Sequence, residues 1–214
     1  MEPNVLFQFY DEFCIKFANE LEKLNIGILS DFLSNKEQMQ NFYHKHIKPN
    51  SPRIVICGIN PAKNGAGKTG IPFLDFNSLS KIMPDINRYD HEKSADFIYS
   101  VIDHFGINIF FKYFYLTNIS CIGFFDIKTK ENVNYYDLPI KMQLFLFDKF
   151  SNDMNIINPK IIIPLGKEVE KNLILDLKHE HKIKTEIGER LFHPSYKHAK
   201  KDDYINLLER YKNI

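Results

Sequence analysis

Two short apolar runs rich in β-branched residues, 53–58 and 160–166, constrain the fold of this chain more than any other feature. Pro52 and Gly58 bound the first run, and Pro159 and Gly166 bound the second. Runs that are apolar on both faces are typical of strands buried inside a parallel sheet. Since parallel strands need long crossovers, usually helices, the intervening segments are expected to be helical.

The segments around these runs have helical periodicity, so strands and helices are expected to alternate along the chain. The first helix is predicted over 4–25, where seven apolar residues recur at helical spacing: Val5, Leu6, Phe9, Phe13, Phe17, Leu21 and Leu24. Further helices are predicted over 31–43, 92–105, 138–158, 167–177 and 202–211, further strands over 111–119 and 183–187, and a long loop over 60–78. This order predicts an α/β fold, a three-layer α/β/α arrangement around a mostly parallel four-stranded sheet.

The length of 214 residues fits one domain, 1–214, with the helices of residues 1–50 packed on the α/β core. Ligands of such sheets bind beyond the carboxyl ends of the strands. The loops after Gly58, Ile119 and Ile187 are therefore where the functional site is expected.

Charge and cysteine usage narrow the possible partners and cofactors. The net charge is only +1, so binding of nucleic acid would need a local basic patch, such as 193–201. The cysteines Cys14, Cys57 and Cys121 are far apart and odd in number, which argues against a disulfide framework, a zinc site or an iron–sulfur cluster. The expectation is a reduced cytoplasmic protein without metal or cofactor, without a signal peptide or membrane span, and monomeric.

A phosphate loop is the main alternative from another class of protein. Gly67-Lys68-Thr69 follows a strand, as the Gly-Lys-Thr of a nucleotide-binding loop does. The motif requires glycine where Ala62 stands, and it must open a helix that holds phosphate at its N-terminus. Pro72 would fall within the first turns of that helix, so a nucleotide-binding NTPase is the weaker interpretation.

Residues 58–73 contain the most specific motif of the chain. They read Gly-Ile-Asn-Pro-Ala-Lys-Asn-Gly-Ala-Gly-Lys-Thr-Gly-Ile-Pro-Phe. This segment resembles the first motif of the single-strand-selective monofunctional uracil-DNA glycosylases, with the Gly-hydrophobic-Asn-Pro start, the middle glycine and the Thr-Gly-hydrophobic-Pro-Phe end at unchanged spacing.

Two later segments resemble the same superfamily in the same order. Residues 116–120, Leu-Thr-Asn-Ile-Ser, place Asn118 at the end of a strand, where the superfamily keeps the asparagine that reads the base. Residues 193–195, His-Pro-Ser, resemble its motif near the C-terminus. Taken alone, each segment is equally well a turn, a cap or a loop. The three together, over about residues 50–200, favour the glycosylase interpretation.

The resemblance implies a monofunctional DNA glycosylase of base-excision repair that flips and excises uracil by attack of water. Asn60 would orient the water, and His193 would donate a hydrogen bond to the departing base as negative charge grows on it. Gly58, Ile59, Phe73 and Asn118 would bind the base, with Phe73 stacking on the ring and Asn118 pairing with O4 and N3–H. Five residues near the C-terminus would contact DNA: Ser195, Tyr196, Lys197, His198 and Lys200.

The chain departs from the animal enzymes at several positions. Ala62 and Lys63 replace a usual Gly-Pro, and Tyr196-Lys197 replaces a usual Pro-Arg, which leaves the wedge residue and the strand preference open. Asp75, two residues after Phe73, resembles a bacterial sub-branch, which implies a location at the nucleoid and a range extending to xanthine or hypoxanthine. A DNA-binding relative without catalysis is a third interpretation, against which the presence of Asn60 and His193 argues.

Overall fold

A four-stranded parallel sheet organises the structure, a computed structural model that describes residues 3–48, 54–180 and 185–213. Its strands are β2 (Ile54–Gly58), β3 (Phe114–Asn118), β6 (Ile161–Pro164) and β7 (Glu186–Ile187), in the order β3-β2-β6-β7. Every residue of β2, β3 and β6 is buried, as expected for the centre of a parallel sheet. The predicted α/β class and parallel sheet are confirmed.

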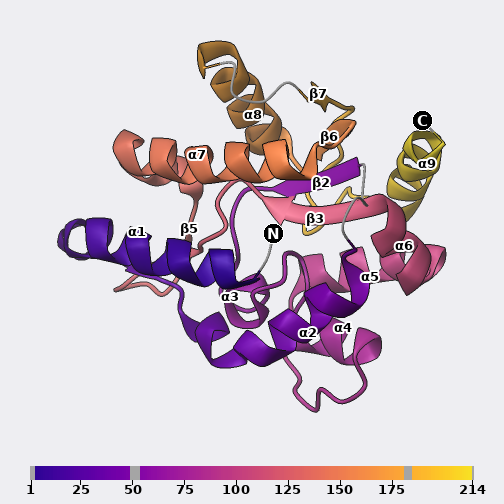
Figure 1. The fold of residues 1–214 in the computed structure, drawn as a ribbon, viewed down its shortest axis with the longest axis horizontal. Helices are drawn as coiled ribbons and strands as arrows, with labels where there is room; N and C mark the ends of the chain where they lie inside the picture. Colours follow the sequence, from indigo (N-terminus) through magenta and orange to yellow (C-terminus); the bar gives the residue numbers. More distant parts are fainter. Residues whose placement is uncertain (1–2, 49–53, 181–184, 214) are drawn as a thin grey trace.

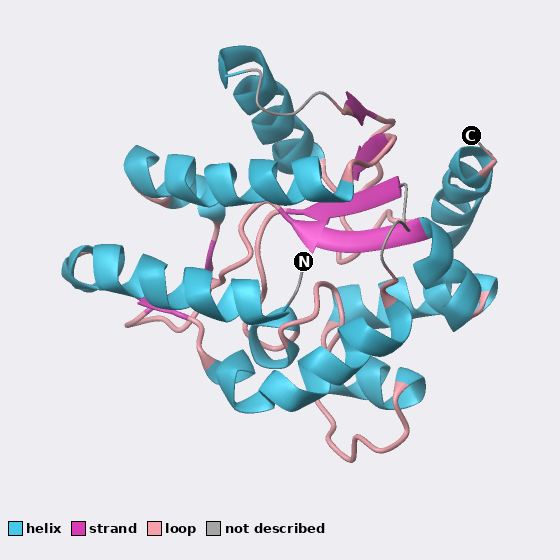
Figure 2. Cartoon of the chain, viewed as in Figure 1, coloured by secondary structure: helices cyan, strands magenta, loops and turns pink. Residues whose placement is uncertain are grey.

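Helices flank this sheet on both sides (Figures 1 and 2). In Figure 1, α7 (Ile140–Ile157) and α8 (Lys167–Glu180) lie above the sheet, while α2 (Lys36–His46), α4 (Phe76–Ile82) and α5 (Lys93–Phe105) lie below it. Helix α9 (Lys201–Lys212) contacts α5. The predicted three-layer arrangement is therefore confirmed.

The first helix, α1 (Pro3–Lys23), packs its apolar stripe on the core. Five of the seven residues that predicted it are buried: Leu6, Phe9, Phe13, Phe17 and Leu21. Val5 and Leu24 are 41% and 48% exposed, because Val5 lies off the stripe and Leu24 follows the last helical residue.

The aromatic segment 111–119 was wrongly predicted to be a strand throughout. Residues Ile107–Tyr113 form a helix, α6, and the strand begins only at Phe114. Gly106, at a φ of +78°, separates α6 from α5, and the helix then buries Phe110 and Phe111. Aromatic residues favour strands in general, but here tertiary burial of a helical face outweighs that preference.

Two other segments differ in detail from their predictions. Residues 31–43 divide into a 3₁₀ helix, η1 (Asp31–Asn35), followed by α2. The predicted loop 60–78 contains one helical turn, α3 (Ala66–Thr69), and the start of α4, whose N-cap Asp75 accepts a hydrogen bond from the backbone N–H of Ser78 at 2.7 Å. Of the predicted strand 183–187, residues 183 and 184 lie outside the described residues.

A second sheet was not predicted at all. Its antiparallel strands are β1 (Ile26–Ile28), β4 (Phe124–Asp126) and β5 (Asn132–Val133), in the order β1-β4-β5, and a short 3₁₀ helix, η2 (Tyr135–Asp137), follows it. Strands of two or three residues are too short for a period to be read from the sequence. This small sheet has a direct role at the site, because it delivers the residues that hold Asn60.

Among the described residues, no helix combines the length and the apolar character that crossing a membrane requires.

Candidate active site

The floor of the candidate site is built where β2 and β3 end side by side. Gly58, the last residue of β2, is the register partner of Asn118, the last residue of β3. The ladder continues one step further, since the N–H of Ile119 donates to the carbonyl of Gly58 at 3.0 Å. The pairing holds the Asn118 side chain, only 6% exposed, against the Cα of Gly58.

His193 reaches the same edge of the sheet through β6. Leu191 forms a parallel bridge with Leu165, the residue after β6, and the N–H of Gly166 donates to the carbonyl of Leu191 at 2.8 Å. His193 then lies beside Gly166, so that a Cβ added to this glycine would be 3.5 Å from the Cβ of His193. The ends of β3, β2 and β6 thus bring together residues that are distant in the sequence. Gly58 is 60 residues from Asn118 and 135 residues from His193.

These strand ends open into a pocket of about 450 Å³. Six residues predicted for the site line it: Ile59, Asn60, Phe73, Asn118, His193 and Ser195. Gly58 lies behind the wall that Phe73 and Asn118 form. The structure therefore brings together the residues of all three motifs.

Phe73 and Gly58 determine the width of the pocket floor. Phe73 has a φ of +60°, a left-handed backbone conformation that is strained for a bulky residue and that recurs at functional sites. In this conformation its ring lies over Gly58, so that a Cβ at Gly58 would be 2.5 Å from Phe73 Cζ and 2.4 Å from Asn118 Oδ1. Only glycine allows both side chains to approach this closely.

Asn60 is held in place by the small antiparallel sheet. Its Oδ1 accepts a hydrogen bond from the backbone N–H of Tyr135 at 2.9 Å, and its Nδ2 donates to the carbonyl of Val133 at 3.3 Å. An amide oxygen has two lone pairs, so one remains for a water in the pocket. The side chain is thereby oriented before any substrate binds.

The hydrogen bonds of His193 assign its tautomer. Its Nδ1 lies 2.8 Å from Ser195 Oγ and 3.3 Å from the backbone N of Ser195. A backbone N–H can only donate, so Nδ1 is the acceptor and the proton is on Nε2. Burial lowers the pKa of His193 below its usual value, which keeps the ring neutral near pH 7. The ring thus offers an Nε2–H as a donor.

The other residues predicted to contact DNA do not line the pocket but follow Ser195 along the chain, and residues 192–200 are called the rim below. Tyr196, Lys197, His198 and Lys200 are all exposed. The first three lie in two consecutive turns, closed by hydrogen bonds from Tyr196 N to His193 O and from Ala199 N to Tyr196 O at 2.8 and 2.9 Å, and Lys200 is the N-cap of α9. The Tyr196 ring packs on Phe192 at 5.3 Å between centroids and contacts His198 at 5.2 Å. An exposed aromatic row therefore continues from the pocket edge.

With the geometry established, comparison with known proteins identifies the family. Residues 44–212 match the model of the uracil DNA glycosylase superfamily. The chain belongs to this superfamily. The crystal structure of SMUG2 from Pedobacter heparinus is similar to it, with 31% sequence identity, a TM-score of 0.75 and 88% of each chain covered. A search of the curated proteins found no match. The protein is accordingly a DNA glycosylase of the SMUG-like branch, a hydrolase that acts on DNA.

The phosphate-loop alternative does not fit the structure of this glycosylase. Thr69, whose hydroxyl would have to reach Mg²⁺, is 1% exposed and donates to the carbonyl of Leu74 at 2.6 Å. Lys68 Nζ forms an ion pair with Asp90 at 2.7 Å. Gly67-Lys68-Thr69 belongs to the single turn α3, which ends at the left-handed Gly70, rather than to the start of a long helix.

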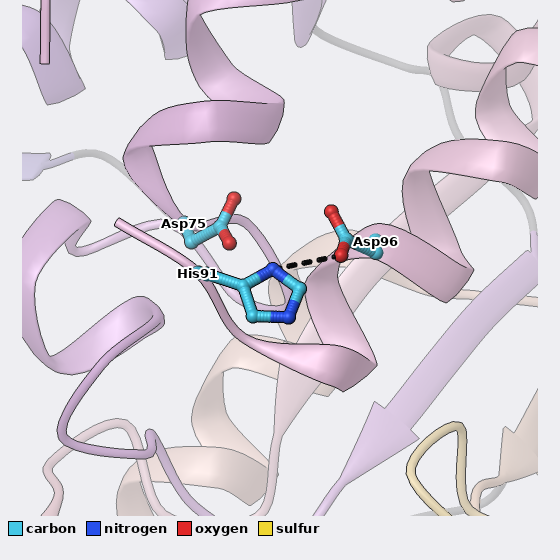
Figure 3. A group of neighbouring side chains, drawn as sticks. All are labelled: Asp75, His91 and Asp96. Atoms are coloured by element: carbon cyan, nitrogen blue, oxygen red, sulfur yellow. Dashed lines mark ion pairs between the residues drawn. The ribbon is translucent and has the colours of Figure 1, made fainter. Parts of the chain in front are cut away.

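One cluster of two acids and a histidine, drawn in Figure 3, includes His91, which lines the pocket of the glycosylase. Asp75, His91 and Asp96 place one ligand-type atom each within 4.8 Å of one another. Both carboxylate oxygens of Asp75 already accept backbone N–H groups, from Ser78 at 2.7 Å and from Glu92 at 2.8 Å. His91 Nδ1 faces Asp96 Oδ2 at 2.9 Å. These contacts connect the start of α5 to α4, which accounts for the cluster.

Several pocket residues of the glycosylase were missed by the sequence analysis: Glu92, Ser94, Asn132 and Asn134. Asn132 Oδ1 accepts a hydrogen bond from the backbone N–H of Lys63 at 3.0 Å, and so connects β5 to the first motif. The Asn-x-Asn spacing over 132–134 was the only local signal for these residues. Glu92 carried none, since its position depends on a contact with Asp75 across 17 residues.

Proposed function

We propose that this DNA glycosylase excises uracil by attack of water, with Asn60 orienting the water and His193 stabilising the departing base. The observation that carries the proposal is the geometry of His193, whose Nδ1 is occupied by Ser195, so that its Nε2–H is the donor that remains. One preorganised donor of this kind is worth about 3–4 kcal/mol in the transition state. It acts as charge develops on O2 of the leaving uracil.

The floor of the pocket provides recognition of the base in this proposal. Asn118 makes no hydrogen bond to another described residue through its side chain, so its amide is available to pair with O4 and N3–H of uracil. Phe73 provides a ring face for stacking, and Gly58 leaves the space in which the two side chains meet. Ile59 lines the same wall.

The reaction is proposed to be purely hydrolytic. An amide such as Asn60 is a poor base, which suits a dissociative step in which the C1′–N1 bond breaks before water arrives. Among the described residues that line the pocket, the one lysine is Lys93, and it is exposed at the first residue of α5. An exposed lysine lacks the burial that activates a lysine as a Schiff-base nucleophile, so we expect no Schiff base and no strand cleavage.

The rim is proposed to hold the DNA while the base is flipped. Ser195 lines the pocket, and the exposed residues Tyr196, Lys197, His198 and Lys200 follow it along the chain. The ring of Phe192, 46% exposed, packs on Tyr196. Lysines contact phosphates, and exposed aromatic rings fill the gap that a flipped base leaves. The described residues pack around one hydrophobic core, which supports one domain, and we propose that it acts as a monomer.

The test uses labelled oligonucleotides carrying a single uracil, single-stranded or paired with guanine or adenine. Hot alkali converts abasic sites to strand breaks, and borohydride traps any Schiff base. Asn60→Ala and His193→Ala are compared with two matched exposed controls, Asn64→Ala and His104→Ala. We expect breaks only after alkali, about 10²–10³-fold slower formation in the His193 variant, and normal rates in the controls. Folded protein without excision of any base would leave a DNA-binding relative instead.

A further inference from the structure

Glu92 is a carboxyl group in the wall of the pocket that the mechanism above does not use. It is the N-cap residue of α5 and lines the same pocket as Asn60, Asn118 and His193. Its side chain makes no capping hydrogen bond to the backbone of its own helix. Capping of α5 therefore does not account for a carboxyl group in the wall of this pocket.

The contacts of Glu92 leave one of its oxygens free. The backbone N–H is fixed by Asp75 Oδ2 at 2.8 Å, and Oε1 accepts a short hydrogen bond from Ser94 Oγ. Oε2 lies against the first motif, since a Cβ on Gly65 would be only 1.7 Å from it. Within the described part of the chain, Oε2 has no hydrogen-bond partner and Glu92 has no ion pair.

The surroundings of Glu92 favour its neutral form. Burial is the largest cause that raises the pKa of Glu92, the charge of Asp75 raises it further, and the hydrogen bond from Ser94 opposes both. The other titratable groups lining the pocket are His91 and Lys93 beside it in sequence and His193 in the third motif. A partly buried acid without a cationic partner destabilises a fold, so its presence in a pocket points to function.

The chemistry of the bases indicates what Glu92 contacts, given the proposed function on which this step rests. Asn118 is assigned to O4 and N3–H of uracil, and His193 to O2. The edge that remains on uracil carries only C5–H and C6–H, with which a carboxyl group forms no hydrogen bond. The corresponding edge of a purine carries N7, an acceptor.

We propose that Glu92 is a specificity-determining catalytic residue for deaminated purines, with its Oε2–H donating to N7 of xanthine or hypoxanthine. Cleavage breaks the C1′–N9 bond, whose electron pair stays on the purine, and the proton of Glu92 moves to N7, so the base departs neutral. The oxygen of water bonds to C1′, and the proton it releases restores the acid form of Glu92. Uracil departs as an anion stabilised by His193 and needs no such proton.

The test compares single-turnover excision of hypoxanthine, xanthine and uracil by the wild-type protein and Glu92→Gln. Glutamine keeps the shape of the side chain and a donor but cannot transfer a proton, and general acids typically contribute about 10²–10⁴-fold. We expect the variant to lose purine excision by at least about 100-fold, and uracil excision far less. The rate of purine excision by the wild type should decline as pH rises through the pKa of Glu92. The pH–rate profile of the variant should lack this decline. The exposed Glu131→Gln is the control and should match the wild type.

An equal loss on all three bases, or an unchanged ratio of purine to uracil excision, would overturn the role of Glu92. Uracil excision by the wild type without purine excision would overturn it too and would leave the proposed function intact. If no base is excised, the proposed function fails. The contact of Glu92 with a purine can then still be tested by measuring DNA binding. Single strands with 2′-fluoro analogues of deoxyinosine or deoxyuridine are then titrated with Glu92→Ala, which removes the donor. A loss of affinity confined to the purine supports the contact, and an equal loss or no loss overturns it.

Discussion

The floor and the rim of the pocket are constructed by different means. At the floor, Phe73 and Asn118 are 8% and 6% exposed, and the pairing of β2 with β3 fixes them against Gly58. At the rim, Phe192 and Tyr196 are 46% and 47% exposed and depend on two short turns after His193. We therefore expect the floor to tolerate little change in shape, and the rim to tolerate substitutions that alter only affinity for DNA.

The largest effect should come from removing the hydrogen-bonding groups of the floor. Asn118→Leu keeps the volume but removes both the donor and the acceptor, each worth about 1–3 kcal/mol when the partner is left unpaired. We expect kcat/KM for uracil to fall by about 10²–10³-fold. Thermal unfolding should occur at an equal or higher temperature, because no hydrogen bond to a described residue is lost. A large drop in that temperature would mean that Asn118 is structural.

A single methyl group at Gly58 should have the next largest effect. The Cβ in Gly58→Ala would lie 2.4 Å from Asn118 Oδ1, so both floor residues must move. Overpacking of this kind costs about 1–3 kcal/mol, and we expect lower stability together with a loss of activity of roughly 10–100-fold. Urea unfolding and single-turnover excision measure the two. Retention of full activity would show that the floor is more adaptable than its packing indicates.

At the rim, Tyr196→Leu should impair binding rather than chemistry. Loss of a stacking ring costs about 1–3 kcal/mol per base, so KM should rise about tenfold while kcat changes little. Steady-state kinetics on single-stranded and duplex substrates separate the two parameters. A fall in kcat at unchanged KM would instead place Tyr196 among the residues that orient the reacting groups.

Lys197→Gln should produce a smaller change, visible mainly in the dependence on salt. If Lys197 contacts one phosphate, its replacement should reduce the slope of log K for DNA binding against log salt concentration by about 1. Fluorescence anisotropy with a labelled single strand, measured over a series of salt concentrations, provides this slope. The control is Lys128→Gln, at an exposed position in the turn after β4. Equal slopes for the two variants would remove Lys197 from the DNA interface.

The smallest effect concerns stability at acid pH. The folded-state pKa of His193 lies below its unfolded value, near 6.5, because burial disfavours the charged ring. As pH falls, the unfolded chain therefore binds the proton before the folded protein does. The folded protein loses stability as pH falls below about 6.5 towards the lower pKa of the folded state. His193→Gln lacks this dependence. Urea unfolding at neutral and at mildly acidic pH gives the free energy of unfolding of both proteins. The excess of the wild type over His193→Gln should shrink or reverse on acidification, and an excess independent of pH would contradict the lowered pKa of His193.

The sequence predicted the floor better than it predicted what supports it. Gly58 and Asn118 stand at the ends of buried apolar runs, and parallel strands necessarily bring such ends to one edge. The contact of Asn60 with Tyr135 joins residues 75 positions apart through strands of two or three residues, which leave no periodic signal. The strand predicted over 111–119 begins only at Phe114, because Phe111 is buried on one face of the helix α6 instead.

The close approach of Phe73 to Gly58 also bears on release of the product. In the proposed function the floor binds a flat ring and an amide edge, and free uracil carries both after the glycosidic bond is broken. The excised base and the next lesion thus compete for one slot. Turnover should consequently slow as free base accumulates, and flat heterocycles with the same edge should act as competitive inhibitors.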